Sequence, residues 1–145
     1  MRIAIVASRF NDFVTDRLLE GAQAALREAG LADSQIDVLR VPGAYEIPMA
    51  AQRVAETGLV SAVVCLGCLI KGATPHFEII ASACAHGITA AAASTGVPMS
   101  FGVLTTNSVE EALERSAPGP SNKGREAADA ALDMARLFAE NPLVR

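Results

Sequence analysis

The sequence predicts a three-layer α/β/α fold in which helices cover both faces of a four-stranded parallel sheet. Short apolar runs rich in β-branched residues alternate with longer segments whose apolar residues recur at helical spacing. The run VSAVVCLGCLI at 60–70 is apolar throughout, which is typical of a strand buried on both faces. Right-handed crossovers between parallel strands need a helix after each strand, so the order β-α-β-α-β-α-β-α-α predicts this fold class.

Turn and capping residues place the ends of the predicted elements. Strands are expected at 2–8, 36–41, 60–70 and 97–104, and helices at 13–29, 46–58, 75–95, 108–115 and 123–140. Asn11 or Asp12 is expected to cap the first of these helices. Thr74 is expected to cap the third, with Pro75 at its first helical position. Ser108 opens a capping box for the short fourth helix.

Size and charge exclude several functional classes. The chain of 145 residues has no long linker and fits one domain spanning 1–145. Its net charge is −4, with one tyrosine and no tryptophan, whereas a nucleic-acid surface needs a basic stripe and stacking aromatic side chains. We therefore expect no nucleic-acid partner, and any anion site must be local.

The three cysteines lie inside apolar segments and are odd in number, which indicates buried thiols in a reducing compartment. Because the N-terminus MRIAIVAS leads straight into a strand pattern rather than a signal peptide, we expect a cytoplasmic protein. Cys65 and Cys68 have the spacing of a redox or zinc pair. An offset of three on a strand points the two side chains to opposite faces, so no metal is expected.

The segment 79–109 contains no Asp, Glu, Lys or Arg. A membrane span is the obvious alternative, but small and polar residues, Gly87, Pro98 and the absence of basic flanks argue against it. A helix that is apolar or small on every side is expected to be buried on every side. In so short a chain, one face is expected to pack against a neighbouring subunit, so the sequence predicts a homo-oligomer and no membrane partner.

Polar and aromatic residues that a core would not need occur in the four segments that follow the predicted strands, at 9–11, 42–46, 71–76 and 105–107. Ligands of such sheets bind at the carboxyl ends of the strands. The segment KGATPH at 71–76 combines a helix N-terminus with a lysine, which favours an anion site. His76 lies in the first helical turn, and a histidine with its ordinary pKa of about 6.5 can transfer protons near neutral pH.

For the other residues near this edge, two interpretations stay open. Phe10 could close the core or stack on a flat ligand, and Glu46 could favour a helix dipole or contact a ligand. Phe101 lies inside a predicted strand, so core packing is expected for its side chain. Arg115 and Lys123 flank the loop APGPSN and could bind a phosphate or form a solvated surface pair. The residues alone point to a small ligand with a phosphate and a planar group, and to one titrating histidine.

Five motifs occur in one order along the chain. They are FND at 10–12, VPGAYEIP at 41–48, LGCLIKGATPHFE at 66–78, FGVLTT at 101–106 and NKG at 122–124. Together they make the chain resemble the lumazine synthases, flavodoxin-like enzymes of riboflavin biosynthesis. The resemblance implies condensation of 5-amino-6-(D-ribitylamino)uracil with 3,4-dihydroxy-2-butanone 4-phosphate to 6,7-dimethyl-8-ribityllumazine, phosphate and water, with no cofactor. It also implies a pentamer, which in some members assembles into a shell of twelve pentamers.

The same resemblance implies roles for individual residues. His76 would transfer protons, and Phe10 would stack on the pyrimidine, which Phe101 would contact through its main chain. The residues that would hold the ribityl chain and ring edges are Ala44, Tyr45, Glu46, Cys68, Leu69 and Ile70. The residues that would hold or lie near the phosphate are Ala73, Thr74, Arg115 and Lys123. The chain departs from the family in Lys71, where arginine is usual, and in the proline-rich loop at 116–124.

Two functions from other classes remain as alternatives at this point. One is a binding or shell-forming protein that keeps the pocket without turnover. The other is a flavodoxin-like carrier of a flavin or nucleotide, which would copurify with a yellow ligand. Arg115 and Lys123 have no evident use in such a carrier.

Overall fold

The computed structural model describes residues 1–145 and contains one parallel sheet with strand order β2-β1-β3-β4. The strands are β1 (Ile3–Ser8), β2 (Ile36–Val41), β3 (Ala62–Ile70) and β4 (Met99–Thr106). Register pairs Ile3 of β1 with Ile36 of β2 and with Ala62 of β3. All four predicted strands start and end within two residues of the observed bounds, and the four-stranded parallel sheet is confirmed.

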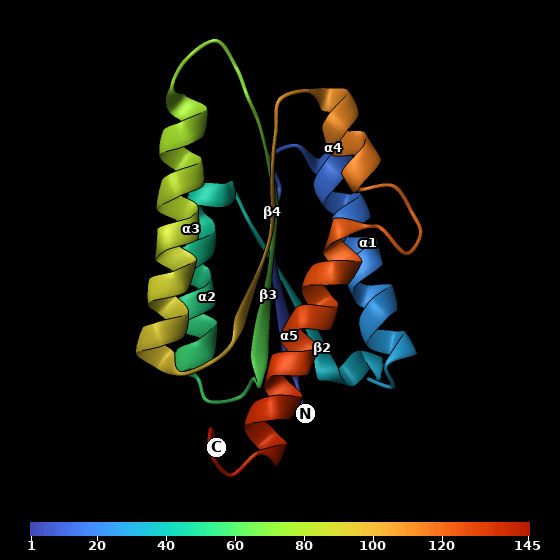
Figure 1. Cartoon of the computed structure of the whole chain (residues 1–145), viewed down its shortest axis with the longest axis vertical. Coiled ribbons are helices and arrows are strands. Elements are labelled where there is room, and N and C mark those ends of the chain that lie inside the picture. The colour runs from blue at the N-terminus through green and yellow to red at the C-terminus, as the bar shows by residue number, and fades with distance from the viewer.

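Helices cover both faces of this sheet, as predicted (Figure 1). On one face lie α1 (Asp12–Glu28), α4 (Val109–Arg115) and α5 (Lys123–Glu140), and on the other lie α2 (Ile47–Glu56) and α3 (His76–Thr95). Two short 3-10 helices, η1 (Asp33–Gln35) and η2 (Ala44–Glu46), flank β2. The three-layer α/β/α class is therefore confirmed.

Strand β4 lies two residues further along the chain than predicted. Its ladder starts after Pro98, which has no N–H to donate and instead accepts a hydrogen bond at 2.9 Å from the Val63 amide. At the other end Thr105 and Thr106 pair with Leu69 and Ile70 of β3. The prediction that these two threonines lie in a loop is wrong.

The two faces of the sheet form two separate apolar clusters. Along β3, Val64, Leu66 and Cys68 point to the α1 and α5 side, whereas Val63 and Cys65 point to the α2 and α3 side. The expected opposite orientation of Cys65 and Cys68 is thus confirmed. All three cysteines are free and buried. Burial raises the pKa of the Cys68 and Cys84 thiols to about 11.

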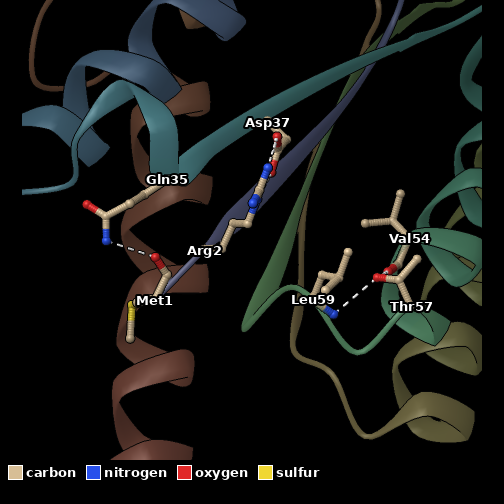
Figure 2. Close-up of polar contacts among 7 residues, drawn as sticks. All are labelled: Met1, Arg2, Gln35, Asp37, Val54, Thr57 and Leu59. Carbon is tan, nitrogen blue, oxygen red and sulfur yellow. Dashed lines mark hydrogen bonds and ion pairs between the residues drawn. The ribbon is translucent and has the colours of Figure 1, made fainter.

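Polar contacts at the amino end of the sheet fix β1 against β2 (Figure 2). The Arg2 guanidinium donates to both carboxylate oxygens of Asp37, and this hydrogen bonding lowers the pKa of Asp37 below its ordinary value. The Gln35 amide donates to the carbonyl of Met1 at 2.9 Å. The same register brings Ser8 and Val41 level at the carboxyl end of the sheet, where the two following loops begin.

Helices α1 and α5 approach each other closely at two glycines. A Cβ on Gly124 would overlap the backbone carbonyl of Leu18, and one on Gly21 would overlap the side chain of Asn122. The Asn122 side chain accepts from the Arg125 amide at 3.0 Å and donates to the Ser116 carbonyl at 2.9 Å. The NKG motif therefore fixes where α5 begins and, with it, where Lys123 lies.

Candidate functional site

A pocket of about 720 Å³ opens at the carboxyl ends of β1, β2 and β3, on the face of the sheet that α2 and α3 cover. Eight of its lining residues are among the predicted site residues. These are Phe10, Ala44, Tyr45, Glu46, Leu69, Ile70, Thr74 and His76. Three of the four predicted loop segments therefore meet at one pocket.

Five predicted residues do not line this pocket within the chain. The Cys68 side chain points into the core on the α1 and α5 side, and only its carbonyl faces the β1–α1 loop. Ala73 is exposed in the loop between the lining residues Gly72 and Thr74. The remaining three, Phe101, Arg115 and Lys123, lie on β4, α4 and the start of α5.

The aromatic wall of the pocket is Phe10, in the tight loop between β1 and α1. This side chain is 66% exposed, so the core does not hold its ring. The loop backbone is fixed instead, because the Phe10 amide donates to the Pro42 carbonyl at 3.0 Å and the Arg9 amide donates to the Val41 carbonyl at 2.7 Å. Phe10 thus presents an aromatic face to the pocket from an ordered main chain.

The pocket also contains the N-terminus of α3. His76 is the first helical residue and its side chain is exposed. The prediction that Thr74 caps this helix is wrong: Pro75 is the capping residue, and no side chain accepts a hydrogen bond from the first turn. The amide groups of this turn therefore stay available, and with the helix dipole they favour a bound anion.

Positive charge near this helix end comes from Lys71. Its Nζ lies 4.0 Å from the Glu78 carboxylate, with both side chains about half exposed. Such a long, solvated pair is worth little, so the ammonium group can turn to another anion at small cost. Within the chain, Lys71 is the cation closest in sequence to the α3 N-terminus.

Phe101 is not a core residue, contrary to expectation. Its side chain is 47% exposed because β4 pairs only with β3 and forms an edge of the sheet. The neighbouring Ser100 and Gly102 are buried, since they point toward α5 on the other face. An aromatic side chain is therefore left uncovered on this edge of the chain.

Arg115 and Lys123 lie on the opposite face of the sheet from the pocket, where α4 and α5 are (Figure 1). Each pairs with a glutamate on its own helix: Arg115 with Glu111 at 3.0 Å and Lys123 with Glu126 at 2.8 Å. Both cationic side chains are 43% exposed. Within a single chain, both side chains therefore form solvated ion pairs on the surface. The pocket of that chain has no arginine in its lining.

Sequence reasoning missed several apolar residues of the pocket wall. Phe77, Ile79 and Ile80 line it from the first turns of α3. For Ile79 and Ile80 the available signal was helical spacing, because residues one turn after His76 share its side of the helix. Pro42 and Gly43 line the pocket from the loop after β2 and belong to a segment that was predicted to face the site.

Comparison with known proteins gives one consistent result. Residues 1–139 match the family described as 6,7-dimethyl-8-ribityllumazine synthase. A curated relative, the 6,7-dimethyl-8-ribityllumazine synthase of Desulfotalea psychrophila, is 48% identical over 136 residues, which are 94% of this chain and 88% of the relative. The match includes all four strands and all five α-helices except the last residue of α5. The chain therefore belongs to the 6,7-dimethyl-8-ribityllumazine synthase family.

Proposed function

We propose that the chain condenses 5-amino-6-(D-ribitylamino)uracil with 3,4-dihydroxy-2-butanone 4-phosphate to give 6,7-dimethyl-8-ribityllumazine, phosphate and water. The observation that carries the proposal is the pocket itself, in a chain that matches the family over residues 1–139. An aromatic face, a carboxylate, a histidine and a free helix N-terminus border this one cavity. These groups suit a flat heterocycle beside a phosphate ester.

The reaction asks for proton transfer and charge neutralisation rather than a protein nucleophile. The 5-amino group of the pyrimidine attacks the ketone, and loss of water leaves a Schiff base. Phosphate is then eliminated, and the ribityl-bearing amine closes the second ring with loss of another water. Holding two substrates in one cavity supplies much of the acceleration, since it replaces a bimolecular encounter by an oriented one.

Each pocket group has a role in this scheme. Phe10 stacks on the pyrimidine, whose ring and ribityl chain are bordered by Ala44, Tyr45 and Glu46. The amide groups of the α3 N-terminus and Lys71 face the phosphate. His76, next to that phosphate, moves protons during Schiff-base formation and phosphate elimination.

The test is to mix the two purified substrates with the chain and to follow the absorbance and green fluorescence of the product. The proposal predicts one lumazine and one inorganic phosphate per turnover, with no added metal or cofactor. Binding of the substrates without product would contradict it and would favour a non-catalytic binding protein of the same fold.

Replacing His76 by alanine is expected to lower kcat by roughly a hundredfold, at the low end of general acid–base contributions, because oriented binding is retained. The KM values should change little. His76→Asn keeps a polar side chain that cannot titrate near neutral pH, so its kcat should fall as far as that of His76→Ala. Full activity of the asparagine variant would exclude proton transfer by His76.

We further propose that the pocket is completed by a second copy of the chain. Phe101 lies on the edge strand β4, and Arg115 and Lys123 lie on α4 and α5, whereas the pocket opens at the carboxyl ends of β1, β2 and β3. A head-to-tail contact between these two different surfaces forms a ring when the rotation between successive copies closes. It would bring the missing arginine and an exposed aromatic residue to the phosphate and pyrimidine ends of the pocket.

The surface of α3 beyond its first turn has no Asp, Glu, Lys or Arg and supports such a ring, proposed here as the pentamer of this family. Only Cys84, Ile88 and Ala91 of α3 are buried within the chain, so the predicted burial on every side does not occur in one copy. By length and composition α3 would also pass as a membrane-spanning helix, a test that core helices of soluble proteins pass too. Small residues and the exposed polar Ser82, His86 and Thr89 favour contact with protein instead.

Ala90→Arg tests this surface, because it places one charge on the exposed, otherwise uncharged side of α3. We expect the native mass to fall from that of a ring to that of a single chain, with helix content unchanged. Ala130→Arg, on the exposed side of α5, is the matched control and should leave the mass unaltered. An intact ring in the Ala90→Arg variant would remove α3 from the subunit interface.

A further inference from the structure

Asn11 has a backbone conformation that sets it apart from every other residue except glycine. Its φ of 60° and ψ of 46° lie in the left-handed region, and it is the only non-glycine residue of the chain with positive φ. Asparagine tolerates this region better than most residues, but the conformation still costs free energy. Such residues cluster at functional sites, where the surrounding structure holds them in place.

The Asn11 side chain does not serve the helix that it precedes. Asn11 is the N-cap of α1, and its carbonyl accepts from the Val14 and Thr15 amides at 2.9 and 3.0 Å. Its side chain accepts no capping hydrogen bond from the first turn. Instead, the Asn11 Nδ2 donates to the Cys68 carbonyl at 2.9 Å, across 57 positions of sequence. The amide therefore ties the β1–α1 loop to β3.

This hydrogen bond completes a clamp around Phe10. On the β2 side, the Arg9 and Phe10 amides donate to the carbonyls of Val41 and Pro42. On the β3 side, the next residue is held by the Cys68 carbonyl. Phe10 is 66% exposed and has no core packing to orient its ring, so its direction depends on the backbone that the clamp fixes.

We propose that Asn11 is a positioning residue for the aromatic wall of the pocket. Its amide and its left-handed backbone together hold Phe10 in the orientation that stacks on the pyrimidine substrate. The role acts through the main chain, because the Asn11 side-chain amide donates to the Cys68 carbonyl. The inference rests on the proposed function, since that function supplies the flat substrate.

Asn11→Gly tests the amide without backbone strain, because glycine adopts positive φ at no steric cost. We expect KM for the aminouracil to rise about fivefold to tenfold, the effect of one lost hydrogen bond on a binding surface. The KM for the butanone phosphate should stay within about twofold, since the groups proposed to bind its phosphate, namely the α3 N-terminus, Lys71 and Arg115, all lie outside the β1–α1 loop. Asn11→Ala should show the same KM change together with a lower Tm, because alanine is strained at positive φ.

Gly30→Ala is the matched control, since Gly30 has φ of 103° and lies just beyond the other end of α1 with open space around it. It should lower Tm without changing either KM. An unchanged aminouracil KM in Asn11→Gly would overturn the inference, as would an equal rise of both KM values.

Hydrogen exchange of the Arg9 and Phe10 amides gives a readout that needs no turnover. Exchange should be faster in Asn11→Gly than in the unsubstituted chain and unchanged in Gly30→Ala. Unchanged exchange in Asn11→Gly would contradict the clamp. If the unsubstituted chain forms no lumazine, the proposed function fails, whereas the exchange result still decides whether Asn11 holds the loop.

Discussion

Replacing Arg115 by alanine is expected to lower kcat/KM roughly a hundredfold, the loss of a charge-assisted, two-pronged contact to phosphate. The change should appear mainly in KM for the butanone phosphate, because the proposal gives the arginine a contact with that substrate only. Steady-state kinetics with each substrate varied in turn would measure it. The pair with Glu111 is 43% exposed on the arginine side, so its loss should leave Tm nearly unchanged.

Two variants control this prediction. Arg115→Lys keeps the charge but loses the planar guanidinium group, so its kcat/KM should lie between those of Arg115→Ala and the unsubstituted chain. Arg53→Ala removes an exposed arginine of α2 that does not line the pocket and should have no kinetic effect. If Arg115→Ala raises KM for both substrates equally, or for neither, Arg115 does not bind the phosphate.

Replacing Gly124 by alanine is expected to have the largest effect on folding. The added Cβ would overlap the carbonyl oxygen, carbonyl carbon and Cα of Leu18, and none of these backbone atoms can move without separating α1 from α5. We expect a loss of about 3 kcal/mol, at the upper end of overpacking costs, and a Tm lower by about 10 °C. Thermal unfolding followed by circular dichroism would measure the change.

Gly72→Ala is the matched control, because nothing lies within 4 Å of the position of its Cβ and its φ is not positive. Its Tm should equal that of the unsubstituted chain. A Gly124→Ala variant with unchanged Tm would show that the two helices can separate freely. The close contact would then not fix the start of α5, nor the place from which Lys123 extends.

The fold class could be predicted from the sequence because several independent local signals indicate the same elements. Helical spacing, buried strand runs and the turn glycines all indicate the same element order, which leaves few topologies. The strand order β2-β1-β3-β4 is different, because no local pattern marks β1 and β3 as the inner strands and β2 and β4 as the edge strands. That information is spread over residues distant in sequence.

The candidate site was predictable where a loop follows a central strand. The segments after β1, β2 and β3 meet because the carboxyl ends of parallel strands share one edge. The segment after β4 does not join them within one chain, because β4 is an edge strand and α4 turns to the other face. Phe101 was misassigned to the core for the same reason: a strand pattern does not reveal which strand is at the edge.

Capping was the other source of error. Thr74 has the right chemistry for a cap, but the chain turns one residue later, at Pro75. Asn11, one of the two predicted candidates with Asp12, is the N-cap of α1, but its side chain holds β3 instead of capping the helix. In both places local preference is overridden by the geometry around the pocket, as is common near functional sites.

The central claim is that one active site uses the pocket of one copy and the arginine of another. Coexpression of Phe10→Asp and Arg115→Ala chains tests it most directly, since each variant alone lacks one half of every site. In a randomly mixed head-to-tail ring, about a quarter of the sites combine an intact Phe10 with an intact Arg115 from the neighbour, so lumazine formation should recover to about a quarter of the unsubstituted rate. If both residues acted within one chain, no mixed site would be intact, and a rate no higher than the average of the two variants would contradict the claim.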